Sequence, residues 1–196
     1  MNPSEQRLEQ LAAELGQQLL LAKSQVSSAE SCTGGGIAEA ITRIPGSSAW
    51  FEAGYVTYSN AQKTRQLGVP EALFGQVGAV SQEVVEAMAR GAQAASGARF
   101  AVAVSGVAGP DGGSPDKPVG TVWLAFGVGD EVTAELARTS ESFAAERQSL
   151  QWQLEGWTLL WPRCLYMGMC QNVLWRVVQG KETWQGNTDL AEWKEI

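Results

Sequence analysis

The chain has 196 residues, 44% of them hydrophobic and 18% charged, which is typical of a globular domain rather than a disordered segment. Its formal net charge of -7, with no basic stripe, excludes a general nucleic-acid binder but leaves room for a small anionic ligand held by backbone amides. Three cysteines argue against a disulfide framework, and neither a signal peptide nor an apolar run of ~20 residues is present, so we expect a cytoplasmic protein without a membrane partner.

In chain order, the apolar pattern predicts helices alternating with strands. Helices are predicted over 4–23, between a tight turn at Ser31 and Pro45, through Lys63, over 71–73, and after a capping Ser81, where Val84, Val85, Met88, Ala92 and Ala95 share one face. Strands are predicted over 25–30, 51–58, 99–105, 119–127 and 131–139, the last two as a hairpin turning at Gly129-Asp130. Such alternation indicates a layered α/β domain with a mixed sheet.

The chain after about residue 150 differs in composition from the rest. Six of the eight tryptophans lie in it, together with Cys164 and Cys170. We therefore divide the chain into a domain over 1–150 and an atypical segment over 151–196. Two interpretations stay open: a final packing helix with a frayed end, or a sequence foreign to this domain, for instance after a change of reading frame.

The segment AESCTGGG, residues 29–36, is predicted to lie where a strand ends and a helix begins. Glycines let the backbone approach a ligand, and the free N–H groups of a helix start favour anionic charge. A nucleophilic Ser31 there would lie beside a ready oxyanion hole. The simpler alternative is that Ser31 or Thr33 only caps the helix.

Lys63 follows the strand that ends near Tyr58, and the chain contains no histidine. The absence of histidine excludes Ser-His-Asp and Cys-His catalysis within the chain and removes the commonest zinc ligand. An activated Ser31 therefore needs another base, and a lysine serves if desolvation or nearby cations lower its pKa. Tyr58 could relay a proton or orient the lysine. The simpler alternatives are a solvated Lys63 and an aromatic residue at a strand end.

A loop of small residues, Ser105–Gly113, follows a predicted buried strand. Loops at the carboxyl ends of strands are where α/β sheets usually bind ligands, although this loop matches no known phosphate-binding fingerprint. The alternative is a long flexible connection. Asp111 and Asp116 are weak evidence for a cation, and we expect neither a metal nor a cofactor.

Taken together, AESCTGG, GSSAWFEAGYVTYSNAQK and VSGVAGPDGG followed by KPVGTVW closely resemble the CinA C-terminal domain family over residues 5–147. The resemblance implies a three-layer α/β/α domain that hydrolyses nicotinamide mononucleotide to nicotinate mononucleotide and ammonia without a metal. It also implies a small-molecule nucleotide as partner, and we expect a homo-oligomer, specifically a dimer. The segment after residue 150 departs from the family pattern.

The resemblance also implies roles for individual residues. Ser31, Lys63 and Tyr58 fall on the family's catalytic serine, lysine and tyrosine. The residues that fall on its substrate-binding positions are Thr33, Gly34, Gly35, Ser105, Gly106, Gly109 and, more weakly, Arg147.

The mechanism that we expect is acyl transfer to Ser31 with neutral Lys63 as base, the oxyanion being held by backbone amides around Cys32–Gly34. One rival makes Cys32 the nucleophile, with Glu30 and Lys63 as acid and base. Another rival is a nucleotide-binding module without turnover.

Overall fold

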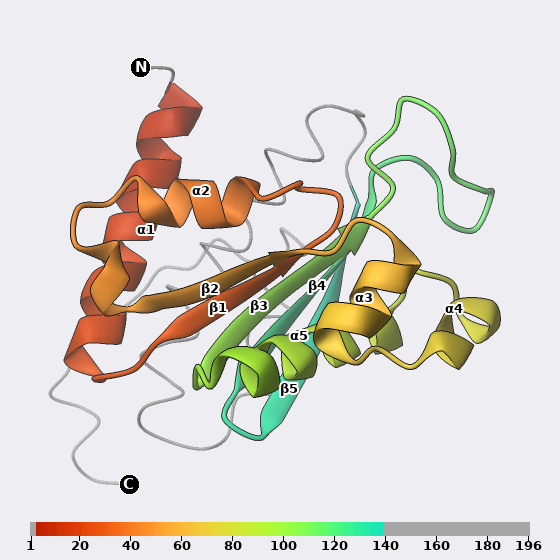
Figure 1. Cartoon of the computed structure of the whole chain (residues 1–196). Helices are drawn as coiled ribbons and strands as arrows, with labels where there is room; N and C mark the ends of the chain where they lie inside the picture. The colour runs from red at the N-terminus through yellow and green to blue at the C-terminus, as the bar shows by residue number, and fades with distance from the viewer. Residues whose placement is uncertain (1–2, 139–196) are drawn as a thin grey trace, which may run out of the picture.

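Five strands form one mixed sheet in the order β2-β1-β3-β4-β5 (Figure 1). The computed structural model describes residues 3–138. The first three strands are parallel, and the last two run antiparallel to their neighbours. The strands are β1 (Val26–Glu30), β2 (Phe51–Val56), β3 (Phe100–Gly106), β4 (Thr121–Val128) and β5 (Glu131–Arg138).

Helices cover both faces of this sheet, as Figure 1 shows. One face carries α1 (Pro3–Leu21) and α2 (Gly36–Thr42), and the short helix η1 (Ser47–Ala49) leads from α2 to β2. The other face carries α5 (Gln82–Ser96), with α3 (Asn60–Leu67) and α4 (Glu71–Gln76) beside it. The predicted three-layer α/β/α class with a mixed sheet is confirmed.

The two faces of the sheet differ in the size of their side chains. On β3, Phe100, Val102 and Val104 belong to the core under α1 and α2, whereas Ala101 and Ala103 belong to the core under α5. Alternation of this kind follows from the two-residue period of a strand. The alanine face lets α5 lie close to the sheet.

The strand predicted before α3 is longer than the observed one, for a reason that concerns the candidate site. The strand predicted over 51–58 ends at Val56, because the chain then turns into α3, where the Ser59 hydroxyl accepts a hydrogen bond from the N–H of Gln62. The tight turn predicted at Ser31 is confirmed, and α2, the helix into which it leads, begins at Gly36.

The predicted inner face of α5 needs one correction. Val84, Val85, Met88 and Ala92 are buried, but Ala95 is exposed. The position four residues after Ala92 is Ser96, which is half-buried and donates a hydrogen bond to the Ala92 carbonyl at 2.6 Å. Ser81 precedes α5 as predicted, but its hydroxyl donates to the Gly78 carbonyl instead of capping the helix.

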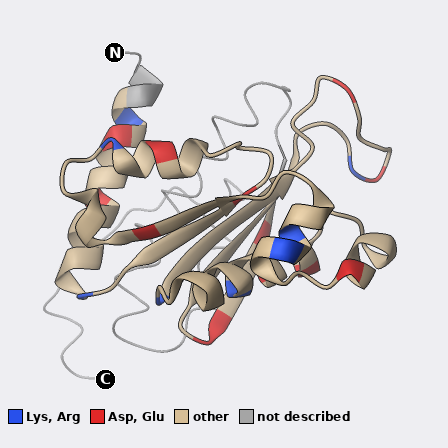
Figure 2. Ribbon diagram, viewed as in Figure 1, with Lys and Arg blue, Asp and Glu red and all other residues tan. Residues whose placement is uncertain are grey.

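In Figure 2 Lys and Arg are dispersed over several elements, and Asp and Glu lie in helices, strands and loops. Within residues 3–138 no helix is both long and apolar enough to cross a membrane. The predicted segment 151–196 and Arg147 lie outside the described residues.

Candidate active site

The three predicted motifs follow three neighbouring parallel strands and so meet at one edge of the sheet. The β1–β2 connection runs over the α2 face and the β2–β3 connection over the α5 face. The strands on either side of β1 are therefore reached by connections that cover opposite faces of the sheet. At such a point an α/β sheet usually has a crevice at the carboxyl ends of its strands. Ser31 lies there, its N–H donating to the Val104 carbonyl of β3 at 3.1 Å.

Ser31 and Lys63 form a buried hydrogen-bonded pair. The distance between Ser31 Oγ and Lys63 Nζ is 2.9 Å, and the two residues are 8% and 1% exposed. The same amine donates to the carbonyl oxygens of Thr57 at 2.9 Å and Tyr58 at 3.3 Å. Two N–H groups satisfy these carbonyls, so a neutral amine keeps its lone pair for the Ser31 hydroxyl.

The environment of Lys63 favours the neutral amine. Burial lowers the pKa of Lys63 from its ordinary 10.5, and the thiol of Cys32 opposes this more weakly. No carboxylate among residues 3–138 forms an ion pair with the amine. A lysine held in this way can accept a proton in a pH range where a solvated lysine cannot.

Tyr58 approaches Lys63 only through its backbone. The carbonyl oxygen accepts from the amine, while the side chain is 72% exposed. The Thr57 carbonyl was not predicted as part of the site, and no sequence signal would have identified it, because every residue has a carbonyl. A catalytic role for the Tyr58 phenol remains a prediction.

The buried side chain of Glu30 accepts hydrogen bonds from the start of α2. Its carboxylate is 0% exposed and accepts five hydrogen bonds. Three of them come from the backbone N–H groups of Gly35, Ile37 and Ala38. The prediction that these helix-start amides are open to an anionic ligand is therefore wrong. All five bonds go to groups other than Cys32, which leaves the rival with Glu30 serving Cys32 without geometric support.

The turn between Ser31 and α2 is held closed by its own backbone. The N–H of Gly34 donates to the Ser31 carbonyl at 3.1 Å, so it cannot also hold an oxyanion. Gly34 and Gly35 have φ values of 59° and 102°, a region that favours glycine. Within residues 3–138, the N–H of Thr33 donates to no other group.

The third motif joins the site through Gly106. A Cβ atom built there would lie 3.1 Å from Cys32 Sγ and 2.9 Å from a methyl group of Val122, so only glycine fits. Ser105, 1% exposed, donates its hydroxyl to the Ala79 carbonyl at 2.8 Å and anchors the chain before α5. Gly109 has a φ of 80° in the loop that follows.

Within the described part of the chain, no three His, Cys, Asp or Glu side chains gather as a metal site would require. The side chains that the site does bring together are a serine hydroxyl and a lysine amine, which are groups able to act as nucleophile and base. Such a pair is a known alternative to the histidine triad in acyl transfer.

Comparison with known proteins gives relatives at high identity. The chain is 74% identical to the nicotinamide-nucleotide amidohydrolase PncC of Pseudomonas putida over 147 residues, which is 74% of this chain and 92% of that protein. It is 47% identical to the PncC of Escherichia coli K12 over 164 residues, which is 83% of this chain and 98% of that protein.

Solved structures agree with these relatives. The competence/damage-inducible protein CihA of Agrobacterium tumefaciens superposes with a TM-score of 0.76 at 41% identity, covering 79% of this chain and 95% of that one. A CinA superfamily protein of Klebsiella pneumoniae gives a TM-score of 0.77 at 29% identity, with coverage of 80% and 98%. The family model described as the CinA C-terminal domain matches residues 8–159, and the chain therefore belongs to the CinA C-terminal domain family.

Proposed function

We propose that this chain is a nicotinamide-nucleotide amidohydrolase that converts nicotinamide mononucleotide to nicotinate mononucleotide and ammonia. The observation that carries the proposal is the buried contact of 2.9 Å between Ser31 Oγ and Lys63 Nζ. The PncC relatives, which are named for this activity, supply the substrate class.

The pair supports a two-step hydrolysis of the carboxamide. Neutral Lys63 accepts the proton of Ser31 as the oxygen attacks the carboxamide carbon. The tetrahedral intermediate then breaks its C–N bond, and Lys63 passes the proton to the departing ammonia. Water, deprotonated by Lys63, next hydrolyses the acyl ester, so that the carboxylate leaves and Ser31 regains its proton.

The oxyanion and the phosphate need separate donors. Of the amides predicted for the oxyanion over Cys32–Gly34, Gly34 is already engaged, which favours the N–H of Thr33. For the phosphate we favour the loop over Gly109, because within the described chain the N–H groups of Ala108 and Gly109 donate to no other group. Substrate contacts by the remaining predicted residues stay proposals; these are Gly35, Ser105, Gly106 and Arg147.

Ammonia release from nicotinamide mononucleotide tests this function directly, with binding measured in parallel by calorimetry. Turnover supports the amidohydrolase. Binding without ammonia would indicate the nucleotide-binding module instead. A cytoplasmic location and a homodimer also remain proposals, which fractionation and light scattering can check.

A further inference from the structure

Glu30 directly precedes the nucleophile, yet it takes no part in the proton transfers described above. We infer that Glu30 is a positioning residue, whose buried carboxylate fixes the turn over residues 31–35 so that Ser31 Oγ stays within reach of Lys63 Nζ. This inference rests on the proposed function, because it concerns the same site.

The five hydrogen bonds of Glu30 divide between its two oxygens and join three parts of the chain. Oε2 accepts from Thr33 Oγ1 at 2.7 Å, from the N–H of Gly35 at 3.1 Å and from the N–H of Ile37 at 3.0 Å. Oε1 accepts from the N–H of Ala38 at 2.9 Å and from Ser28 Oγ at 3.2 Å. One carboxylate thus ties β1, the turn and α2 together.

α2 depends on outside support for its orientation. It has seven residues, and a helix of that length is not stable on its own. Gly35, at its N-cap position, offers no side chain to cap it. The Glu30 carboxylate satisfies three backbone N–H groups at the helix start, as a capping side chain normally would.

The backbone of Glu30 supports the other half of the catalytic pair. Its carbonyl oxygen accepts from the N–H of Thr57 at 2.8 Å. The Thr57 carbonyl in turn accepts from Lys63 Nζ at 2.9 Å. A single residue therefore connects the Ser31 turn, through its side chain, with the segment that holds the Lys63 amine, through its backbone.

The site requires a carboxylate and not merely a side chain of this size. A glutamine would place an NH₂ group where one oxygen now accepts hydrogen bonds. In one orientation the NH₂ would face the N–H of Ala38, and in the other it would face the N–H groups of Gly35 and Ile37. Either way a backbone N–H that is partly or fully buried loses its acceptor, and the turn must shift.

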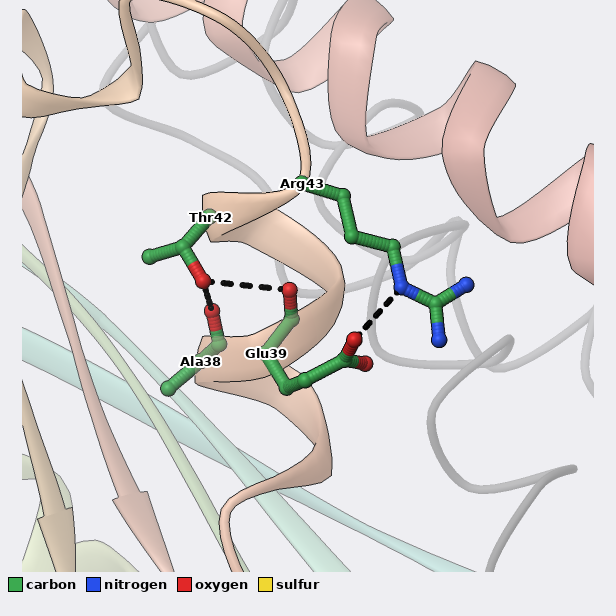
Figure 3. Close-up of polar contacts among 4 residues, drawn as sticks. All are labelled: Ala38, Glu39, Thr42 and Arg43. Carbon is green, nitrogen blue, oxygen red and sulfur yellow. Dashed lines mark hydrogen bonds and ion pairs between the residues drawn. The ribbon is translucent and has the colours of Figure 1, made fainter.

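The test compares Glu30→Gln with Glu39→Gln. Glu39 lies on the same helix but its side chain is 57% exposed, and it pairs with Arg43 at 2.6 Å (Figure 3). The first readout is covalent labelling of Ser31 by a fluorophosphonate: the Oγ–P bond forms, fluoride leaves and the proton passes to Lys63. This readout needs no nucleotide substrate.

We expect Glu30→Gln to lower the labelling rate on the order of 10- to 100-fold at equal folded fraction, because small displacements of a reacting group are that costly. With nicotinamide mononucleotide, kcat should fall by a similar factor while KM changes little. The pH at which activity rises should stay in place, since the Lys63 environment is unchanged. Glu39→Gln should match the wild type in every readout.

Wild-type labelling by folded Glu30→Gln would overturn the inference, as would a change in KM alone. If Glu30→Gln does not fold, Glu30→Asp decides the matter, because it keeps the charge but withdraws the carboxylate by one methylene. Folded Glu30→Asp should also label slowly, and a wild-type rate would overturn the inference. A wild type that labels at Ser31 but releases no ammonia refutes the proposed substrate and leaves the labelling test intact.

Discussion

Lys63 is one of the largest side chains that the described part of the chain buries completely, and its amine forms no ion pair with a carboxylate there. A desolvated amine of this kind lowers its pKa because the charged form loses its hydration. Two carbonyls fix the direction of the amine, so it faces Ser31. Burial thus accounts for the lowered pKa of Lys63, and the two carbonyls account for the direction in which its amine faces.

Lys63→Arg tests whether the residue acts as a base or only as a positive charge. Guanidinium stays protonated at all accessible pH values, so this variant cannot accept the Ser31 proton. We expect kcat to fall on the order of 100- to 10,000-fold, about as much as in Lys63→Met, while binding of the nucleotide changes less. Steady-state kinetics and calorimetry measure the two effects. Near-normal turnover in Lys63→Arg would mean that the position needs only charge.

The pH dependence of wild-type activity tests the same role of Lys63. The proposed mechanism requires the neutral amine, so it predicts that kcat/KM rises as the pH increases through the pKa of Lys63. Because burial lowers that pKa from 10.5, the rise should occur at lower pH than a solvated lysine would give. A rise only near pH 10.5 would show that burial does not lower the pKa of Lys63.

Ser31→Ala and Cys32→Ala separate the two nucleophiles that the sequence offers. Ser31 Oγ contacts Lys63 Nζ directly and is the proposed nucleophile, so its removal should lower kcat by at least about 1,000-fold without unfolding the protein. Cys32→Ala should keep most of the activity. An active Ser31→Ala together with an inactive Cys32→Ala would reverse the assignment.

At the scale of elements, the sequence predicts what local periodicity and caps determine. The apolar spacing predicts α5, and its largest error, Ala95, falls in the last turn. The start of α2 could not be predicted in this way, because its amides bind a side chain from the end of β1. The available signal was Glu30 itself: an acidic residue at the end of a buried strand must find donors nearby.

The contact between α3 and α5 depends on a glycine. A Cβ atom on Gly91 would lie 2.0 Å from the backbone oxygen of Leu67, which cannot move without displacing the end of α3. Replacing glycine with alanine inside a helix normally adds stability. Here Gly91→Ala should instead lower the free energy of unfolding by about 3 kcal/mol, as overpacking does.

Gly75→Ala in α4 is the matched control, since nothing lies within 4 Å of the added Cβ. It should raise the free energy of unfolding by a few tenths to about 1 kcal/mol. Urea denaturation measures both variants. If Gly91→Ala is as stable as Gly75→Ala, helices α3 and α5 are not in close contact in solution.

At the scale of the whole molecule, strand order explains why residues distant in sequence form one site. The order β2-β1-β3 brings the segments after all three strands to a single edge, where Ser31 contacts Lys63 and Gly106 lies beside Cys32. The joint role of these segments is predicted from the resemblance of their motifs to the CinA C-terminal domain family. The distance between Ser31 and Lys63 follows from tertiary packing, which local patterns do not encode.

The stability of the whole molecule should depend on pH through the buried Lys63 and the half-buried Glu135, which act in opposite directions. Burial raises the pKa of Glu135, on β5, from 4.5 to about 7. Between these values the folded protein binds more protons than the unfolded chain, so stability falls as the pH rises. Lys63 acts in the opposite direction at alkaline pH. Between its lowered pKa and 10.5 the unfolded chain binds more protons, so stability rises with pH.

Glu135→Gln removes the contribution of Glu135 to the pH dependence of stability and leaves that of Lys63. The glutamine cannot ionise, so at pH 8 the variant should exceed the wild type in free energy of unfolding by about 1–2 kcal/mol, a value reduced for partial solvent screening. The difference should shrink towards zero as the pH falls from about 7 to 4.5. Glu131→Gln, at an exposed position on the same strand, is the control and should follow the wild type. Urea unfolding at each pH gives the free energy of unfolding of each variant. If the difference between Glu135→Gln and wild type does not vary over this pH range, Glu135 keeps an ordinary pKa in the folded protein.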